Sequence, residues 1–327
     1  ANQLGPKYCS RAVSGASIVM VRYSQVTQSG LKEHPVQISI FGSLSGLESP
    51  VDDTVAYLNQ LREEGFRRAW FAQMPYEPDL LTVLTVGLRE VDGIEVGTGV
   101  LPIQNQLPML LAQRALTISQ MAGGRLLLGL GMTHQAVTEG MWGIPWDKPV
   151  RRLNEYLDGL LPLLNGEKAD ATGETVTTRG ALIIPGAPTP PVYIAALGPK
   201  LLQIAGRRSA GTVTWMTGPK TLAGHVSPTL RQAAADAGRA DAVRVVAAIP
   251  VAVTDDVDGA RKQAAEQFAI YGHLPSYRAM LDREGYAGPE DIAIIGDELT
   301  VRDRLAELEA AGVDEYVGVT FEPSAEG

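Results

Sequence analysis

The sequence lacks the residues on which several common kinds of protein chemistry depend. Its 327 residues include one cysteine, Cys9, and four histidines. A lone thiol cannot form an internal disulfide, and this composition is typical of a reducing cytoplasm. The histidines are scattered, without the close spacing that metal ligands show, so the sequence predicts no metal site.

Positive charge and long hydrophobic runs are also scarce. Lys and Arg number 28 against 37 Asp and Glu, which gives a formal net charge of −9. An acidic chain repels the phosphates of nucleic acid and the headgroups of anionic membranes, so we expect neither as a partner. No apolar run approaches the roughly 20 residues that a membrane-spanning helix needs. We therefore expect a cytoplasmic protein that acts on a small molecule.

The first 35 residues differ from the rest of the chain. They carry four basic residues and no acidic residue before Glu33. The apolar stretch 16–21 is too short and too interrupted for a convincing signal peptide. We expect residues 1–35 to form an N-terminal extension outside the folded core, and residues 36–327 to form a single domain.

From residue 36 onward, strand-like patterns alternate with helix-like patterns. Apolar strands joined by helices indicate a parallel sheet that is buried on both faces, and eight such units close into a (β/α)8 barrel. An open, doubly wound sheet is the alternative, but no Gly-x-Gly-x-x-Gly follows the first strand. The eight predicted strands are residues 36–42, 68–73, 94–100, 125–131, 192–196, 212–216, 243–253 and 314–320.

Two connections are longer than a barrel requires. Residues 132–191 follow the fourth strand, and residues 254–313 follow the seventh. The first connection contains a hairpin-like segment at residues 173–180. Long connections in a compact barrel usually form binding or lid segments. We therefore expect both insertions to lie at the catalytic mouth.

The carboxyl ends of the strands, where barrel enzymes place their active sites, carry two similar turns. Gly198-Pro199-Lys200 follows the fifth strand, and Thr217-Gly218-Pro219-Lys220 follows the sixth. The unpaired N–H groups at a helix N-terminus favour an anion, so two adjacent turns of this kind predict a phosphate site. The alternative is that Gly and Pro stand there only because such turns favour them.

Few ionisable residues stand where they could act directly on a substrate. His134 follows the fourth strand and could serve as an acid or a base, although a lone loop histidine can equally be a bystander. No carboxylate pair, Ser/His/Asp order or cysteine nucleophile stands out, and sugar hydrolysis would need the first of these. A phosphate site beside so few ionisable groups favours a cofactor that carries the reactive atom itself.

Several segments, in order along the chain, resemble the bacterial luciferase-like flavin oxidoreductases, and most closely the branch that uses the deazaflavin coenzyme F420. The resemblance implies a (β/α)8 barrel with insertions after strands 4 and 7, a cofactor lying across the strand ends, and a homodimer. The resembling segments are Gly97–Val100, Gly124–Gly131, Ala195–Lys200, Trp215–Pro219 and Ile295–Arg302.

The resemblance also implies which residues form the site. A non-proline cis peptide between Gly99 and Val100 would support the cofactor ring. Residues 132–134 would line the ring and the substrate side, with His134 as the catalytic residue. The implied cofactor-binding residues are Gln73, Gly99, Val100, Met132, Thr133, Ala196, Leu197, Gly198, Pro199, Lys200, Thr217 and Gly218.

We therefore expect an F420-dependent oxidoreductase that transfers a hydride between the deazaflavin ring and a small, largely apolar or conjugated substrate, with His134 handling the proton. Sugar-phosphate oxidation is not expected, because Gln73 and His134 replace acidic residues of the sugar-phosphate dehydrogenases of this branch. An FMN-dependent monooxygenase and a non-catalytic flavin-binding protein remain alternatives, since all three would use a phosphate site.

The basic residues near the two turns add a further expectation. Lys200 and Lys220 would neutralise the cofactor phosphate. Together with Arg207 and Arg208 they would form one cationic rim, suited to an acidic cofactor tail.

Overall fold

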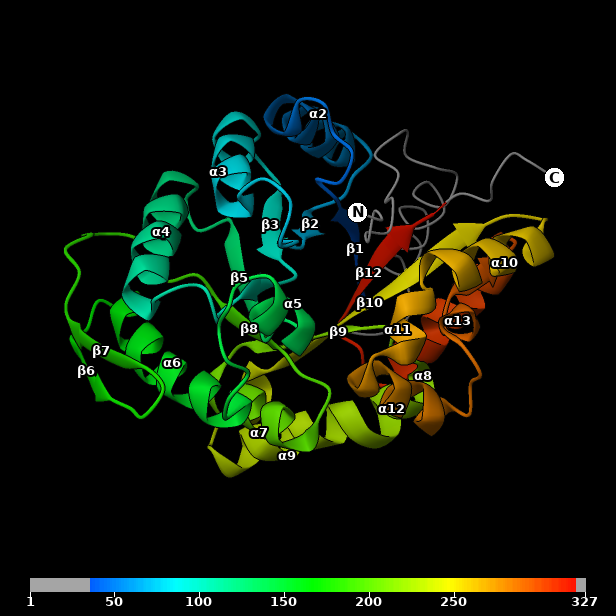
Figure 1. Cartoon of the computed structure of the whole chain (residues 1–327). Coiled ribbons are helices and arrows are strands. Elements are labelled where there is room, and N and C mark those ends of the chain that lie inside the picture. The colour runs from blue at the N-terminus through cyan, green and yellow to red at the C-terminus, as the bar shows by residue number, and fades with distance from the viewer. Residues whose placement is uncertain (1–35, 322–327) are drawn as a thin grey trace.

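The computed structural model describes residues 36–321, so the predicted N-terminal extension lies outside the described residues. Eight parallel strands form one closed sheet in which the last strand pairs with the first, as Figure 1 shows. This confirms the predicted (β/α)8 barrel. The barrel strands are β1 (Gln37–Gly42), β2 (Arg68–Phe71), β3 (Glu95–Thr98), β5 (Leu126–Gly131), β8 (Val192–Ala195), β9 (Gly211–Trp215), β10 (Arg244–Val253) and β12 (Glu315–Thr320).

Helices surround the barrel (Figure 1). Several begin with proline, which has no N–H to leave unpaired and whose backbone angle suits a first turn. The surrounding helices are α2 (Pro50–Glu63), α3 (Leu80–Glu90), α4 (Pro108–Met121), α6 (Pro149–Leu164), α7 (Pro199–Arg208), α9 (Ser227–Asp236) and α13 (Glu298–Ala310). Between β9 and α9 the chain forms α8 (Pro219–Thr221) and the π-helix η1 (Leu222–Val226). Short pieces complete the fold: β4 (Leu101–Pro102), β11 (Ile294–Gly296), η2 (Ala240–Ala242) and η3 (Pro289–Asp291).

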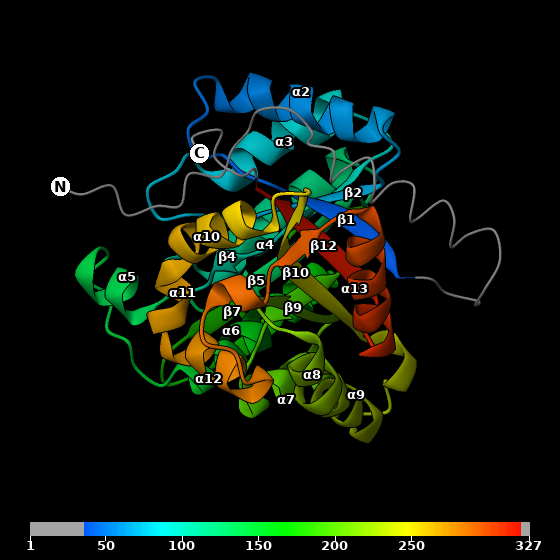
Figure 2. The ribbon, with the colours of Figure 1, turned by 90° about the vertical axis from the view of Figure 1, so that its right-hand side faces the viewer.

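The two long connections place helices on the same side of the barrel. The first contributes α5 (Gln135–Gly140), and the second contributes α10 (Val257–Gln267), α11 (Ala269–His273) and α12 (Pro275–Glu284). In Figure 2, α5, α10 and α11 all lie on the left of the barrel. Because α5 directly follows β5, this is the side where the strands end. The expectation of insertions at the mouth is confirmed for these helices.

The predicted hairpin exists but lies elsewhere. Strands β6 (Ala169–Thr172) and β7 (Thr177–Gly180) pair antiparallel and pack against α6, at the outer edge of the molecule in Figure 1. Thr178 is buried against Gly159 of α6, where any larger residue would overlap its side chain. The expectation that the whole first insertion lies at the mouth is therefore wrong for the hairpin, because its buried side chains face α6.

Large side chains fill the barrel interior. Trp70 is buried at its centre, and its ring lies edge-on to Tyr193 with 5.5 Å between centroids. A Cβ atom at Gly97 would overlap the Trp70 ring, so the neighbouring strand passes close to the indole only because that position is glycine. The interior cluster consists of Trp70, Leu127, Tyr193, Val213, Val246, Ala248, Val317 and Val319.

A buried carboxylate ties the last strand to the first ones. Glu315 of β12 has no exposed surface and accepts hydrogen bonds from Ser39 Oγ at 2.7 Å and Trp70 Nε1 at 2.7 Å. Arg68 forms a close ion pair with Glu315 and also donates from Nε to Glu95 at 3.0 Å. Nearby carboxylates favour the charged guanidinium, and the pKa of Arg68 is raised although burial opposes this. The network joins β1, β2, β3 and β12.

Replacing Glu315 should therefore destabilise the barrel strongly. Glu315→Gln removes the charge opposite a largely buried guanidinium, which typically costs about 3–5 kcal/mol of unfolding free energy. The matched control is Glu95→Gln, which affects the same arginine from a carboxylate whose side chain is 42% exposed. Its cost should stay below about 1 kcal/mol. Chemical denaturation measures both, and equal losses in the two variants would contradict this account.

Candidate active site

The end of β3 carries an unusual backbone feature at the barrel mouth. The peptide bond between Gly99 and Val100 is cis, as the resemblance implies. Gly99 N donates to the Phe71 carbonyl at 2.6 Å, and the Val100 carbonyl accepts from Gln73 N at 3.2 Å. Both Gly99 and Val100 are half-buried, so this turn forms part of the surface over the strand ends.

Gln73, predicted to contact the cofactor, uses its side chain inside its own loop. Its Oε1 accepts from Leu80 N at 2.7 Å, and its Nε2 donates to the carbonyls of Met74 at 2.8 Å and Pro78 at 3.2 Å. The amide therefore shapes the connection between β2 and α3. The link of Gln73 to the cis turn is made by its backbone.

The first predicted phosphate turn is open. Gly198, Pro199 and Lys200 are exposed at the N-terminus of the ten-residue helix α7, and no side chain caps that helix. A Cβ atom placed on Gly198 would meet nothing within 4 Å, so the space over the turn is free. His225 of η1 lies 2.8 Å from the Leu197 carbonyl through Nε2 and fixes the preceding residue. Ala196 is buried beneath the turn, and Leu197 is half-buried.

The second predicted turn is closed by a side chain that we did not predict there. Both oxygens of Glu284, the last residue of α12, accept backbone N–H groups: Lys220 N at 3.3 Å and Thr221 N at 2.5 Å. Glu284 is 2% exposed, and a Cβ atom on Gly218 would overlap its carboxylate. The hydroxyl of Thr217 donates a hydrogen bond to the Trp215 carbonyl at 3.1 Å.

The two turns therefore differ in the structure, and the phosphate contacts of Thr217 and Gly218 stay a prediction. The carboxylate of Glu284 accepts the N–H groups of Lys220 and Thr221, which directly follow the predicted phosphate contacts Thr217 and Gly218. The ammonium group of Lys220 donates to the Glu284 carbonyl at 3.1 Å, which directs it to α12.

The predicted cationic rim is not assembled. Arg208 lies at the opposite end of α7 from Gly198 and pairs with Asp158 of α6 at 2.7 Å. A ten-residue helix is about 15 Å long, so Arg207 and Arg208 lie far from the phosphate turn. Lys200 alone remains beside the open turn, and no ion pair with it is found within residues 36–321.

The loop after β5 brings Met132, Thr133 and His134 to the mouth, all half-buried. Gln104, a buried side chain from the loop after β4, supports this loop: its Oε1 accepts from Thr133 N at 3.3 Å, and its Nε2 lies 3.5 Å from the Thr133 carbonyl. His134 precedes α5 in extended conformation, and its side chain makes no capping hydrogen bond.

An aromatic cluster covers this side of the mouth. Trp215 at the end of β9 lies edge-on to Tyr271 of α11, with 5.5 Å between centroids, and Tyr271 lies 5.1 Å from Tyr277 of α12. The Tyr277 ring lies 6.1 Å from that of His134. Burial in these apolar surroundings lowers the pKa of His134, so the imidazole is neutral near neutral pH. The cluster thus joins the second insertion to the only histidine predicted in the site.

The sequence prediction missed one carboxylate at the mouth. Glu77, four residues after Gln73, is half-buried and accepts a hydrogen bond from the Ser45 hydroxyl in the loop after β1. The position of a carboxylate in the loop after the second strand could have indicated a site residue. The sequence does not show, however, that the loop folds so that Glu77 contacts Ser45. Glu284 had no comparable signal, because its partner turn is far away in the sequence.

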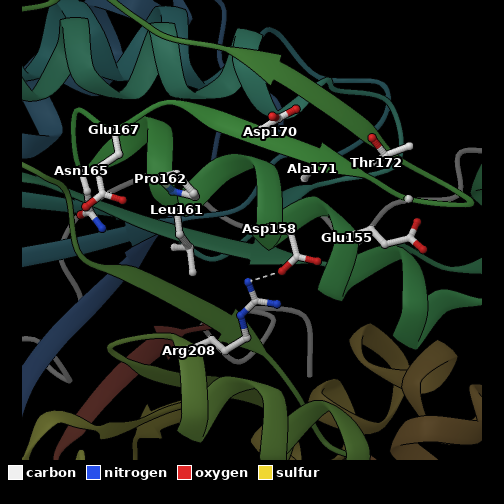
Figure 3. Close-up of a pocket in the computed structure, with 11 residues that line it drawn as sticks. Glu155, Asp158, Leu161, Pro162, Asn165, Glu167, Asp170, Ala171, Thr172 and Arg208 are labelled. Atoms are coloured by element: carbon white, nitrogen blue, oxygen red, sulfur yellow. Dashed lines mark hydrogen bonds and ion pairs between the residues drawn. The ribbon is translucent and has the colours of Figure 1, made fainter.

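A cavity of about 680 Å³ lies away from the strand ends. It is formed by α6, the β6–β7 hairpin and the end of α7, and Figure 3 shows Arg208 reaching across it to Asp158. We place the candidate site at the mouth instead, because the cis turn, the open turn at Gly198 and His134 all lie at that end of the barrel. Within residues 36–321, no group of three or more His, Cys, Asp or Glu side chains is placed to hold a metal ion, and no helix has the length and apolar character needed to cross a membrane.

Comparison with known proteins identifies the family. The luciferase-like monooxygenase family matches residues 34–315, so the chain belongs to this family. Among its relatives is a 5,10-methylenetetrahydromethanopterin reductase of Methanolobus tindarius. The two are 29% identical over 223 residues, which are 68% of this chain and 67% of the relative.

Solved structures of other proteins share the fold. An F420-dependent secondary alcohol dehydrogenase, solved with an F420–acetone adduct, superposes with a TM-score of 0.76 at 18% identity, over 88% of this chain and 95% of that one. The oxygenating constituent of 3,6-diketocamphane monooxygenase from Pseudomonas putida, solved with FMN, gives a TM-score of 0.70 at 16% identity, over 87% and 91%. At such identities the likeness establishes the fold alone.

Removing the internal anion should expose the second turn. In Glu284→Ala, the amide resonances of Lys220 and Thr221 should shift on titration with inorganic phosphate, whereas in the unmodified protein they should not. Asp282→Ala, which removes an exposed carboxylate from the same helix, is the control. NMR of labelled protein measures both, and an equal response in the unmodified protein would show that Glu284 does not close the turn.

Exposing His134 should raise its pKa. Tyr277→Ala removes the ring that shields the imidazole, so the titration midpoint should move up toward the ordinary histidine value. Because the unfolded chain binds this proton more readily, His134 also weakens folding as the pH falls below about 6.5. Ring-proton NMR follows the midpoint, with Tyr286→Ala as a control beside Lys220. An unchanged midpoint in Tyr277→Ala would refute the role of burial.

Proposed function

We propose that this protein is an F420-dependent oxidoreductase that transfers a hydride between the deazaflavin ring and a small organic substrate. The observation that carries the proposal is the open, uncapped N-terminus of α7 at Gly198, at the same end of the barrel as the cis turn after β3. It is supported by relatives whose names specify F420 or a pterin reductase.

The residues present fit a phosphate-bearing cofactor at one place. The free backbone N–H groups at the start of α7 and the ammonium of Lys200 would hold its phosphate, while the helix dipole favours the negative charge. Gly99, Val100, Met132 and Thr133 would contact its ring. When bound, the deazaflavin supplies the hydride chemistry.

The chain's own residues would supply the proton chemistry and the apolar surroundings. His134, neutral near pH 7, would accept or return a proton next to the reacting atoms. Trp215, Tyr271 and Tyr277 cover the mouth with aromatic surface, which suits an apolar or conjugated substrate and limits the access of water. We further propose that the protein works as a cytoplasmic homodimer, and that residues 36–327 are one domain.

The second candidate is an FMN-dependent monooxygenase, favoured by the likeness to the FMN-bound monooxygenase. The experiment that separates the two is titration of the purified protein with F420 and with FMN, followed by ring absorbance and fluorescence. Tight binding of F420 is expected. Binding of FMN alone would overturn the proposal, and binding of either cofactor without turnover of any acceptor would favour a non-catalytic binding protein.

A charge placed at Gly198 should weaken cofactor binding without harming the fold. The position is open and has an ordinary backbone conformation, so Gly198→Asp fits and caps α7. Its carboxylate would occupy the amides meant for the phosphate, and F420 should bind at least about tenfold more weakly, a loss of about 1.4 kcal/mol. Gly198→Asn caps the helix without charge and is the control. Equal affinity of both variants and the unmodified protein would place the phosphate elsewhere.

A further inference from the structure

Glu77 occupies a distinctive position between two loops of the mouth. It belongs to the connection between β2 and α3, and its Oε1 accepts the hydroxyl hydrogen of Ser45 from the connection between β1 and α2. The carboxyl group is half-buried, and within residues 36–321 no arginine, lysine or histidine forms an ion pair with it. A carboxylate that only stabilised the loops would usually be paired or fully hydrated.

The neighbourhood of Glu77 faces the aromatic cluster across the mouth. The adjacent residue, Tyr76, is 51% exposed and interacts electrostatically with Tyr271 of α11. Tyr271 contacts Trp215 and Tyr277, and Tyr277 contacts His134. The loops after β2 and β5 therefore both border the aromatic cluster, and they carry Glu77 and His134 from different strands.

Burial shifts the pKa values of Glu77 and His134 in opposite directions. Burial raises the pKa of Glu77, and the hydrogen bond from Ser45 opposes this by stabilising the carboxylate. Burial lowers the pKa of His134. A carboxyl group that holds its proton more firmly than usual can act as an acid, and a neutral imidazole can act as a base.

We propose that Glu77 is a second catalytic acid–base group of this site, working opposite His134; this rests on the proposed function. When a substrate is reduced, its carbon would receive a hydride, which is a proton with two electrons, from the reduced cofactor. The neighbouring substrate atom takes the proton of the Glu77 carboxyl group, whose O–H bond breaks. The Ser45 hydroxyl then stabilises the carboxylate, and neutral His134 takes up the proton that the cofactor gives up. In substrate oxidation both protons move in reverse.

The first test needs no substrate. Carboxyl-carbon NMR of protein labelled in glutamate follows the titration of Glu77, assigned with Glu77→Gln. We expect its midpoint above the ordinary glutamate value, a further rise in Ser45→Ala, and a change of the Glu77 signal when F420 is added. An ordinary midpoint, or a signal indifferent to F420 in a protein that binds it, would overturn the role of Glu77.

The second test uses reduced F420 with a panel of conjugated enones, followed by the return of F420 absorbance. Glu77→Gln should bind F420 within about threefold of the unmodified affinity but turn over about 100-fold more slowly. Its pH–rate profile should lose the limb assigned to the carboxyl group, Glu77→Asp should restore part of the rate, and Ser45→Ala should move that limb upward. Glu48→Gln changes an exposed carboxylate in the loop after β1 and is the control.

The two tests separate the two proposals. Failure of the unmodified protein to bind F420 would overturn the proposed function itself. Binding of F420 with full activity and an unchanged profile in Glu77→Gln would overturn only the inference about Glu77. If no enone of the panel is reduced, the NMR titration alone decides.

Discussion

The buried carboxylate of Glu315 is the interaction on which the rest of the molecule depends. It lies on the last strand and contacts a serine of the first strand and an arginine and a tryptophan of the second. These contacts hold the last strand to the first two and so stabilise the closed barrel. One of its donors, Trp70, is also the largest side chain of the interior, and a neighbouring glycine makes room for the indole. A mouth built from eight loops needs such a fixed base, because loops hold their positions only as well as the strands that carry them.

On that base, the mouth combines two kinds of recognition. The turn at Gly198 offers backbone groups and open space, so under the proposed function it would recognise an anion by charge and shape. Another part consists of Trp215 at the end of β9 and of Tyr271 and Tyr277 in the second insertion, and it offers aromatic surface. Glu284 fixes the aromatic part to the barrel, since it anchors the end of α12 to the turn after β9. The position of the inserted aromatic residues therefore depends on a helix N-terminus of the barrel itself.

The sequence predicted the barrel well, because its strands are short runs rich in apolar residues and the helices around it begin with a capping residue or a proline in the first turn. It also predicted the cis turn at Gly99 through the resemblance. It could not distinguish the two Gly-Pro-Lys turns, which look alike locally and differ only in whether a distant carboxylate covers them. The placement of Arg208 went wrong for a related reason: it is close in sequence to the predicted phosphate turn at Gly198, but it lies at the far end of α7. Contacts between distant segments decide such cases, and local patterns do not encode them.

The buried side chain of Trp70 affects the order in which molecules can bind at the mouth. Because Trp70 and its neighbours fill the axis, molecules can approach the strand ends from the loop side alone. A flat cofactor bound over those strand ends would form the surface on which the substrate must bind. The substrate would then have to bind after the cofactor and its product would have to leave first, which is an ordered kinetic mechanism.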